Sequence, residues 1–258
     1  MADVKEVNDK YELTSKKIRI GDTVLYRIKA ISDFGDVKTG DYGGYIESES
    51  NLSFKHGESG ELVDTAWVYD QGIVYGNAVV SGKAKVEDFA SVYGDTAISG
   101  TAKVSGHAIV CGNAKVLENA HVYGNAKISD YAVISGSAEV FGNVRVYDHA
   151  KIFDNAKVFG NVWAYGNSQI YDSALIYGNV QVFGNAWVYG TSKVYENVRL
   201  FGYISVMGES EVFGNGWFES EFRMNWDDRV YNNTQFVGNS RMNSLLLEYI
   251  DGRFNLKK

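Results

Sequence analysis

Cationic and aromatic side chains recur two positions apart in the second half of the chain. The pairs are Arg145 and Tyr147, Lys151 and Phe153, Lys157 and Phe159, Lys193 and Tyr195, and Arg199 and Phe201. Residues two positions apart on a strand share one face. An aromatic ring beside a cation can stack on a nucleobase and hold a phosphate. These pairs therefore indicate a surface that could contact a partner or a small nucleotide-like ligand.

Tryptophans extend the same pattern. Trp163 precedes Tyr165, and Trp187 precedes Tyr189, again with one residue between them, and Trp217 occupies an equivalent place. The candidate binding residues are Arg145, Tyr147, Lys151, Phe153, Lys157, Phe159, Trp163, Tyr165, Trp187, Tyr189, Lys193, Tyr195 and Arg199.

Histidine is the other residue type here that could do chemistry, as a general base or as a zinc ligand. The chain has four, His56, His107, His121 and His149. Their spacing does not bring three together, so we expect solvated or corner histidines and no metal site. Glycine-rich phosphate loops are absent from the sequence. We expect no catalytic residue and no cofactor.

The element that must position these residues is a six-residue repeat. Thirty consecutive hexads run from Val68 to the one that begins at Met242, without insertion or deletion. Position one is usually Val or Ile, positions three and four are usually Gly-Asn or Asp-Asn, and position five is small. A repeat this short cannot bury an apolar face alone, so neighbouring repeats must stack into a solenoid.

The hexad also predicts which side chains point inward. Positions five and one share one face of a short strand, and positions six and two share the other. Lys85, Lys103, Lys127 and Lys157 fall at position six, which marks that face as outward, and Cys111 falls at outward position two. Three hexads close a three-sided coil, so thirty give about ten coils of an all-β, single-stranded parallel β-helix. The absence of proline fits, because each ladder position needs its N–H.

Both ends of such a solenoid need a cap, because unpaired strand edges associate. Residues 1–67 contain a predicted hairpin around Gly21-Asp22 and an acidic, glycine-rich connector from Asp33 to Ser53. We expect this N-terminal cap, a regular β-helix over 68–217, and degenerate coils with a C-terminal cap over 218–258.

Composition restricts the partners and the compartment. The chain has 25 Lys and Arg against 32 Asp and Glu, a net charge of −7, which argues against duplex nucleic acid. One cysteine gives no disulfide framework, and no run of about 20 apolar residues predicts a membrane span. We expect a cytoplasmic protein.

The repeat resembles the hexapeptide, left-handed β-helix superfamily, which includes acyltransferases and γ-class carbonic anhydrases. The segment from Gly40 to Ser53, followed by Trp67-Val68-Tyr69, is similar to the lead-in of the YdcK-like hexapeptide proteins of bacteria, prophages and phages. The resemblance implies a left-handed coil and a phage or prophage setting. It also implies that an enzyme of this kind would use a histidine as general base.

Outward position two changes character halfway along the repeat. It is mostly serine or tyrosine before Ser135, but it is aromatic in twelve of the thirteen hexads from Phe141 to Phe213. Stacked rings that only stabilise the coil are one explanation. A contact surface is the other, because monomers seldom expose so much contiguous apolar area.

The sequence thus favours a non-enzymatic binding or scaffold protein. We expect it to form a homo-oligomer, with a trimer as the first choice, and to sequester a host protein or a small nucleotide-like signal. The alternatives are a hexapeptide-type acyltransferase and a passive structural shaft.

Overall fold

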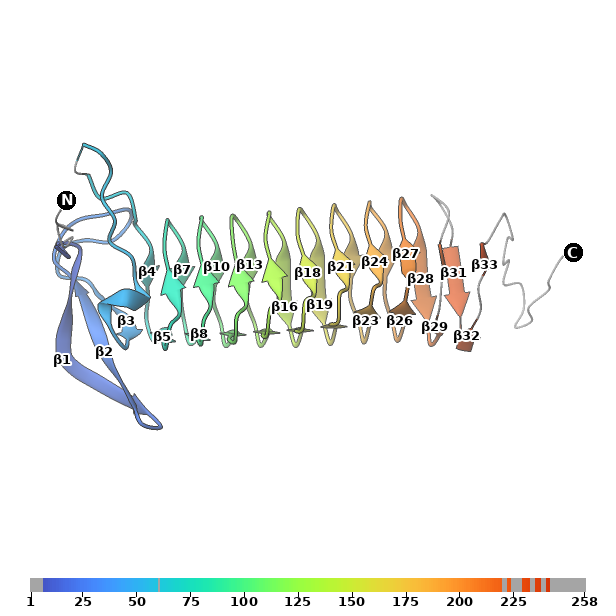
Figure 1. Ribbon diagram of the computed structural model, residues 1–258, viewed down its shortest axis with the longest axis horizontal. Coiled ribbons are helices and arrows are strands. Elements are labelled where there is room, and N and C mark those ends of the chain that lie inside the picture. The colour runs from blue at the N-terminus through green and yellow to red at the C-terminus, as the bar shows by residue number, and fades with distance from the viewer. Residues whose placement is uncertain are drawn as a thin grey trace, which may run out of the picture. The chain divides into compact units, whose positions relative to one another are not determined.

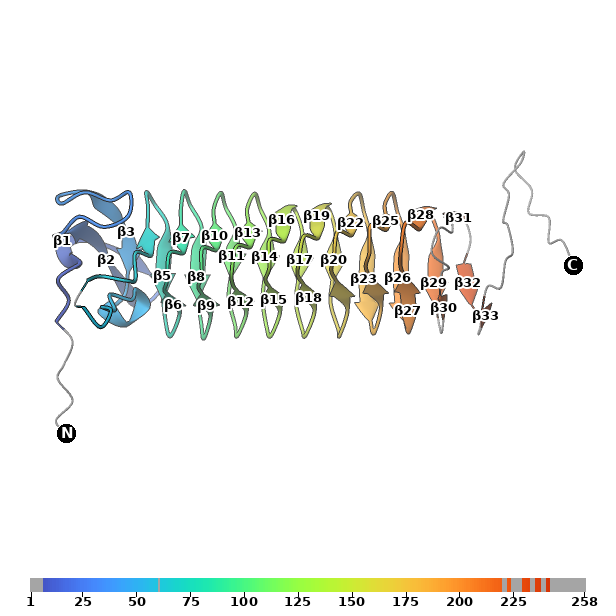
Figure 2. The same cartoon turned by 90° about the horizontal axis from the view of Figure 1, so that it is seen from above.

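The computed structural model describes residues 7–59, 61–219, 222–223, 229–232, 235–237 and 240–241, with only the backbone described at 222–223, 231–232, 235–237 and 240–241. The chain divides into two compact units, residues 1–125 and 126–258. In each unit the hexads form short strands that stack in parallel into three sheets (Figures 1 and 2). This confirms the predicted all-β parallel solenoid, and it is consistent with the left-handed β-helix that the resemblance implies.

Unit 1 combines an antiparallel hairpin with the first coils. Its hairpin sheet contains β1 (Tyr11–Ile20), β2 (Thr23–Ala30), β3 (Tyr42–Ile46), β5 (Ile73–Tyr75), β8 (Ser91–Tyr93) and β11 (Ile109–Val110). The second sheet contains β4 (Trp67–Val68), β7 (Lys85–Val86), β10 (Lys103–Val104) and β13 (His121–Val122). The third contains β6 (Val79–Val80), β9 (Ala97–Ile98) and β12 (Lys115–Val116), and a single helical turn, η1, spans Glu49–Asn51.

Unit 2 consists of parallel coils. Sheet I contains β14 (Lys127–Ile128), β17 (Arg145–Val146), β20 (Trp163–Ala164), β23 (Gln181–Gly184), β26 (Arg199–Gly202), β29 (Trp217–Glu219) and β32 (Gln235–Val237). Sheet II contains β16 (Glu139–Gly142), β19 (Lys157–Gly160), β22 (Leu175–Ile176), β25 (Lys193–Val194), β28 (Glu211–Gly214) and β31 (Arg229–Asn232). Sheet III contains β15 (Val133–Ile134), β18 (Lys151–Ile152), β21 (Gln169–Ile170), β24 (Trp187–Val188), β27 (Ile204–Val206), β30 (Phe222–Arg223) and β33 (Ser240–Arg241).

Positions one and five form the core of both units, as the hexad predicts. Val158 and Ile170 at position one, and Ala156 and Ala174 at position five, are almost completely buried. Strands pair with the strand 18 residues further on, as in Lys157 with Leu175 and Val158 with Ile176. Because three hexads separate paired residues, each outward position forms a column along the axis, and columns of one sheet never mix with those of another.

At each corner the residue at position three adopts the left-handed backbone conformation. Eight of these residues are acidic and have φ between 51° and 66°, the left-handed region in which glycine is normally preferred. Asp88 shows what offsets this strain, because its carboxylate accepts a hydrogen bond of 2.8 Å from the backbone N–H of Gly106, one coil further on. Asp148 and Asp172 accept from Gly166 and Gly190 in the same way, each at 3.0 Å. These carboxylates therefore link successive coils.

The N-terminal cap differs in detail from its prediction. The hairpin is present, but its first strand is longer than expected and begins at Tyr11. The connector is not only a linker, because Ile46 pairs with Val74 and Leu52 forms a parallel bridge to Val80. The segment thus supplies part of a coil before the strict hexads begin.

Cys111 also departs from its prediction. It was expected on the outer surface, but only 8% of it is exposed. Burial, followed by a hydrogen bond with this thiol, raises the pKa of Tyr93 to about 12.

The boundaries proposed at residues 67 and 217 stay predictions. The hexad frame continues through β30–β33, but the terminal segment expected to act as a C-terminal cap lies, beyond Arg241, outside the described residues. No helix in the part of the chain that the structure describes is long and apolar enough to cross a membrane.

A buried lysine fastens the cap to the first coil. The Nζ of Lys10 donates to the carbonyl oxygens of Ser53 and Ala66, both at 2.7 Å, and lies 5.1 Å from the centroid of the Phe34 ring. The side chain has no exposed surface. Burial lowers the pKa of Lys10 from its ordinary value of 10.5 to about 7, against an opposing effect of the Asp64 carboxylate.

This burial predicts a pH-dependent stability. The folded protein releases the Lys10 proton near pH 7, whereas the unfolded chain keeps it until about 10.5. The unfolded state therefore binds more protons in that window, so the free energy of unfolding should rise with pH from about 7 to about 9. Urea denaturation at several pH values checks this. The variant Lys10→Met should lose the slope, and an equal slope in both proteins would contradict the assignment.

Candidate functional site

One row of outward side chains on sheet I combines cations with tryptophans. It consists of the position-six residues of six successive coils, and strand pairing places each beside the next: Lys127, Arg145, Trp163, Gln181, Arg199 and Trp217. We call this set the cation–tryptophan row. The 18-residue register of the coils alone brings these residues together.

Arginine and tryptophan are in contact at two places in the row. The guanidinium carbon of Arg145 lies 5.2 Å from the centroid of the Trp163 ring, and that of Arg199 lies 4.7 Å from the centroid of the Trp217 ring. Both separations are within the range of cation–π attraction. The two indoles remain accessible, with 37% of Trp163 and 47% of Trp217 exposed.

The positive charge of the row has no matching negative charge within it. The row contains three cations and no carboxylate, and within the described residues no ion pair involves Lys127, Arg145 or Arg199. The corner residues Asp130 and Asp148 follow β14 and β17, but their carboxylates accept backbone hydrogen bonds. The three cations of the row therefore have no ion-pair partner among the described residues, although the carboxylates of Asp130, Asp148 and Glu219 belong to the same sheet or its corners.

Sheet II provides the contrast, because its position-six cations are paired. Lys157 lies 2.8 Å from a Glu139 carboxylate oxygen, and Glu211 binds Lys193 at 3.0 Å and Arg229 at 2.8 Å. The hydrogen bond from Lys193, aided by Arg229, lowers the pKa of Glu211. These side chains connect neighbouring coils, and their charges largely cancel.

The aromatic residues of position two form three stacked columns in unit 2. Neighbouring rings within them have centroids 4.6–5.3 Å apart and planes within 22° of parallel. The columns are Phe141, Phe159, Tyr177, Tyr195 and Phe213; then Tyr147, Tyr165, Phe183 and Phe201; then Phe153, Tyr171 and Tyr189. Because each inner ring has a ring on both faces, it presents only its edge to solvent.

The stacking of the rings limits the nucleotide binding that the sequence predicts for them. A nucleobase could stack on an inner ring only if the column opened. Most of these rings are half-buried by their neighbours. The rings of the columns are therefore open to a ligand mainly at their edges, whereas Lys127, Arg145, Trp163 and Trp217 of the row are exposed.

The thirteen candidate residues do not form one site, because they are distributed over the three sheets. Five lie on or next to sheet I strands: Arg145, Tyr147, Trp163, Tyr165 and Arg199. Four belong to sheet II, namely Lys157, Phe159, Lys193 and Tyr195, and four to sheet III, namely Lys151, Phe153, Trp187 and Tyr189. Only the sheet I set adjoins the unpaired cationic row.

An asparagine ladder borders the row, and the sequence analysis did not assign it to this sheet. Each side-chain amide donates to the amide oxygen one coil further on, over 2.5–3.0 Å. The ladder contains Asn143, Asn161, Asn179, Asn197 and Asn215. Each of them precedes a member of the row by two residues, so the ladder fixes the corner from which sheet I begins. Sorting the sequence at intervals of 18 would have revealed it.

The histidines lie apart and have structural contacts. His107 stacks on Phe89 and His149 stacks on Tyr131, in each case with ring centroids 5.1 Å apart. His56 contacts Asp9 at 3.1 Å. Among the described residues, no group of three or more His, Cys, Asp or Glu side chains could hold a metal ion.

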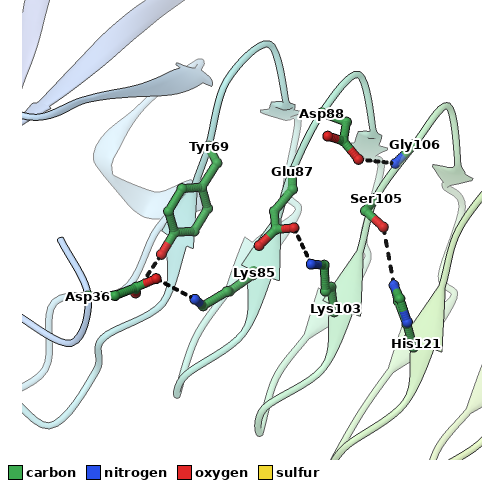
Figure 3. A network of polar contacts seen from close by, with 9 residues as sticks. All are labelled: Asp36, Tyr69, Lys85, Glu87, Asp88, Lys103, Ser105, Gly106 and His121. Carbon is green, nitrogen blue, oxygen red and sulfur yellow. Dashed lines mark hydrogen bonds and ion pairs between the residues drawn. The ribbon is translucent and has the colours of Figure 1, made fainter.

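The second sheet of unit 1 carries a polar network that the sequence analysis missed (Figure 3). Asp36 accepts hydrogen bonds from the Tyr69 hydroxyl and from Lys85, both at 2.7 Å. The bond from Lys85 is the main cause of the lowered pKa of Asp36.

The network continues along the next coils. Lys103 pairs with Glu87, and Ser105 lies 3.2 Å from His121 Nε2 (Figure 3). His121 also stacks on Tyr123, with centroids 4.3 Å apart. The lysines of this network are compensated, unlike the cations of the cation–tryptophan row.

Comparison with known proteins gives limited support for a relationship. No family model matches the chain. A segment of 64 residues is 39% identical to the "Uncharacterized acetyltransferase YdcK" of Escherichia coli (strain K12). The match covers 24% of this chain and 17% of that protein, so the chain spans well under two thirds of the relative's length. Together with the parallel solenoid, the match fits a hexapeptide-repeat β-helix.

The stacked columns predict that the loss of a ring from a column destabilises the protein more than the loss of an exposed ring outside the columns. Tyr177 lies between Phe159 and Tyr195, at centroid distances of 5.3 and 5.1 Å. Tyr177→Ser should lower the free energy of unfolding by about 1–3 kcal/mol, because each lost ring contact is worth about 0.5–1.5 kcal/mol. Urea denaturation measures this, and Tyr203→Ser is the control because Tyr203 is 66% exposed. Equal losses in the two variants would contradict a stabilising role of the columns.

Proposed function

We propose that this protein is a non-enzymatic binding protein that holds an anionic partner against the cation–tryptophan row of unit 2. The observation that carries the proposal is that the cations of the row have no ion-pair partner among the described residues. Lys127, Arg145 and Arg199 share one sheet without a carboxylate in their row, while the cations of sheet II are paired with Glu139 and Glu211. A solenoid that only needed solubility would gain nothing from this segregation.

The composition of the row also suits recognition. Arginine and tryptophan are the residue types that most often dominate the energy of protein interfaces. Segregated charge attracts a partner of opposite sign even when the net charge of the whole protein is unfavourable. Since the accessible groups lie on a regular sheet rather than in a cleft, an extended or flat partner fits better than a compact ligand.

Self-association belongs to the same proposal. Copies packed around a threefold axis would make a homotrimer, and such a particle could sequester a host protein or a small nucleotide-like signal in the cytoplasm of a bacterium or of a phage-infected cell. The mass of the native assembly in solution measures the number of copies. The regular faces and the resemblance to hexapeptide-repeat proteins support this part of the proposal.

A charge-matched test compares the cations of the row with the paired cations of sheet II. At low salt the protein should be retained on a sulfonate resin despite its net charge of −7, because the row concentrates positive charge. The double variant Arg145→Gln, Arg199→Gln should elute at clearly lower salt. The matched control Lys157→Gln, Lys193→Gln removes the same formal charge from sheet II, where Glu139 and Glu211 already neutralise it.

The two double variants decide the proposal. Equal reductions of the eluting salt concentration would mean that net charge alone controls retention. In that case the row would not be a binding surface, and the solenoid would be better explained as a passive structural shaft.

A second candidate function is acyl transfer. The similarity of 64 residues to a protein named as an acetyltransferase favours it. Such an enzyme would need a histidine beside the acceptor, and His121, hydrogen-bonded to Ser105, is the best-placed one among the described residues. The short extent of the match and the contacts of the other histidines make it the weaker proposal.

Acetyl-coenzyme A turnover discriminates between the two functions. The binding proposal predicts no saturable acyl transfer by the wild type. The variants His107→Ala, His121→Ala and His149→Ala should then retain the same resin elution. Saturable transfer that disappears in one of these variants would replace the binding proposal by the acyltransferase.

A further inference from the structure

The cation–tryptophan row, together with Gln235 at the next place in its register, contains the same three-residue pattern twice. Arg145, Trp163 and Gln181 occupy three successive coils, and Arg199, Trp217 and Gln235 occupy the next three in the same register. The cation–π contact is repeated as well, at 5.2 Å in the first set and 4.7 Å in the second. The row therefore presents two equivalent arginine–tryptophan pairs.

Each pair is built to receive an oxyanion. Stacking on the indole holds the guanidinium plane in place while its N–H groups stay available, and a planar guanidinium matches the two oxygens of a carboxylate or phosphate. No carboxylate among the described side chains occupies either guanidinium. The indole N–H of an exposed tryptophan offers one further donor.

The separation of the two pairs is set by the coil. Arg145 and Arg199 are three coils apart, and three stacked strands at ~4.8 Å each give about 14 Å. The ring column beside the row, from Tyr147 to Phe201, measures the same interval with centroid spacings of 4.8, 4.7 and 4.6 Å. A ligand that used both pairs would need two anionic groups at this distance.

An extended polypeptide meets this requirement. Four residues of a β-strand span about 13–14 Å, and side chains four positions apart point to the same side. Carboxylates at positions i and i+4 of an extended segment that lies along the solenoid axis would therefore reach Arg145 and Arg199 together. Two carboxylates three positions apart would be closer together by the length of one residue, and they would point to opposite sides of the strand.

Single-stranded nucleic acid fits the same surface less well. Its binding without sequence preference depends on bases that stack on open aromatic faces. The faces of Tyr165 and Phe183 beside the row are covered by neighbouring rings, and each row indole has a guanidinium on one face.

We infer that the cation–tryptophan row binds an extended acidic segment of a partner protein, with two carboxylates four residues apart engaging Arg145 and Arg199. This inference rests on the proposed binding function and narrows its partner to one chemical class. Two linked contacts reinforce each other, because the second forms within the same complex. The loss of either arginine should therefore remove most of the affinity.

The test uses the full chain and three probes measured by titration calorimetry or fluorescence anisotropy. The first is a synthetic peptide of about thirteen residues, rich in Thr and Ser, with Glu at i and i+4 and four residues of extended chain on each side of this segment. The second has the same composition with Glu at i and i+3. The third is an oligothymidylate of similar length, which supplies phosphates and bases.

The first peptide should bind the wild type, and the second should bind roughly tenfold more weakly or worse, because one charge-assisted pair is lost. Arg145→Gln and Arg199→Gln should each weaken the first peptide by a similar factor. Arg145→Lys should restore binding only in part, because lysine lacks the planar fork. The control Lys157→Gln, on sheet II, should leave peptide binding unchanged.

The other outcomes separate this inference from the proposed function. Equal affinity for both peptides, or tighter binding of the oligothymidylate that depends on Arg145 and Arg199, would overturn the acidic-peptide assignment while the row remained a binding surface. Failure of all three probes, together with resin elution that does not depend on the two arginines, would overturn both. Melting curves of the variants establish that each has folded.

Discussion

Backbone hydrogen bonds along the axis are the constraint on which the rest of the structure depends. The N–H of Lys151 donates to the carbonyl of Ser168, and the N–H of Tyr171 donates to that of Val188, each to the coil that follows. Since such bonds recur at every strand, an inserted residue would shift all later pairs of the ladder. The same ladder places equivalent residues of successive coils beside each other at about 4.8 Å.

That spacing turns a sequence repeat into chemical columns. At this distance aromatic rings stack face to face, asparagine amides reach one another, and lysine meets glutamate. The side chains that recur every 18 residues decide whether a column stabilises the coils or leaves groups available to a partner. The sheet I row is unusual in this respect, because its neighbours are cations and indoles instead of opposite charges. The stability of the coils does not explain why the cations of this row have no ion-pair partner among the described residues.

Much of this architecture could be predicted from the hexad. The small and branched residues of positions five and one predicted the core, and Val158 and Ala156 are buried as expected. The sheet that each outward residue occupies was also implicit in the sequence, because three hexads per coil fix it. Grouping position-two aromatics along the chain, instead of every 18 residues, hid the separate columns.

Other features depend on contacts that no local pattern encodes. Lys10 is buried because the cap folds back over the carbonyls of Ser53 and Ala66, which are 43 and 56 residues away. Whether a ring at position two stacks on its neighbour or splays into solvent depends on the rotamers of both. Whether a cation at position six forms an ion pair depends on the residue one coil away. Lys157 and Arg145 occupy the same position of the hexad, but only Lys157 has a carboxylate partner, Glu139.

The indole N–H signals in a proton–nitrogen NMR spectrum test the central claim most directly. On addition of the acidic peptide with carboxylates four residues apart, the account predicts shifts for Trp163 and Trp217, which belong to the row. The signals of Trp67, which is buried, and of Trp187, which is 43% exposed but lies on sheet III, should stay in place. A shift of Trp187 as large as those of Trp163 and Trp217, or no shift of the two row signals at saturating peptide, would contradict the account.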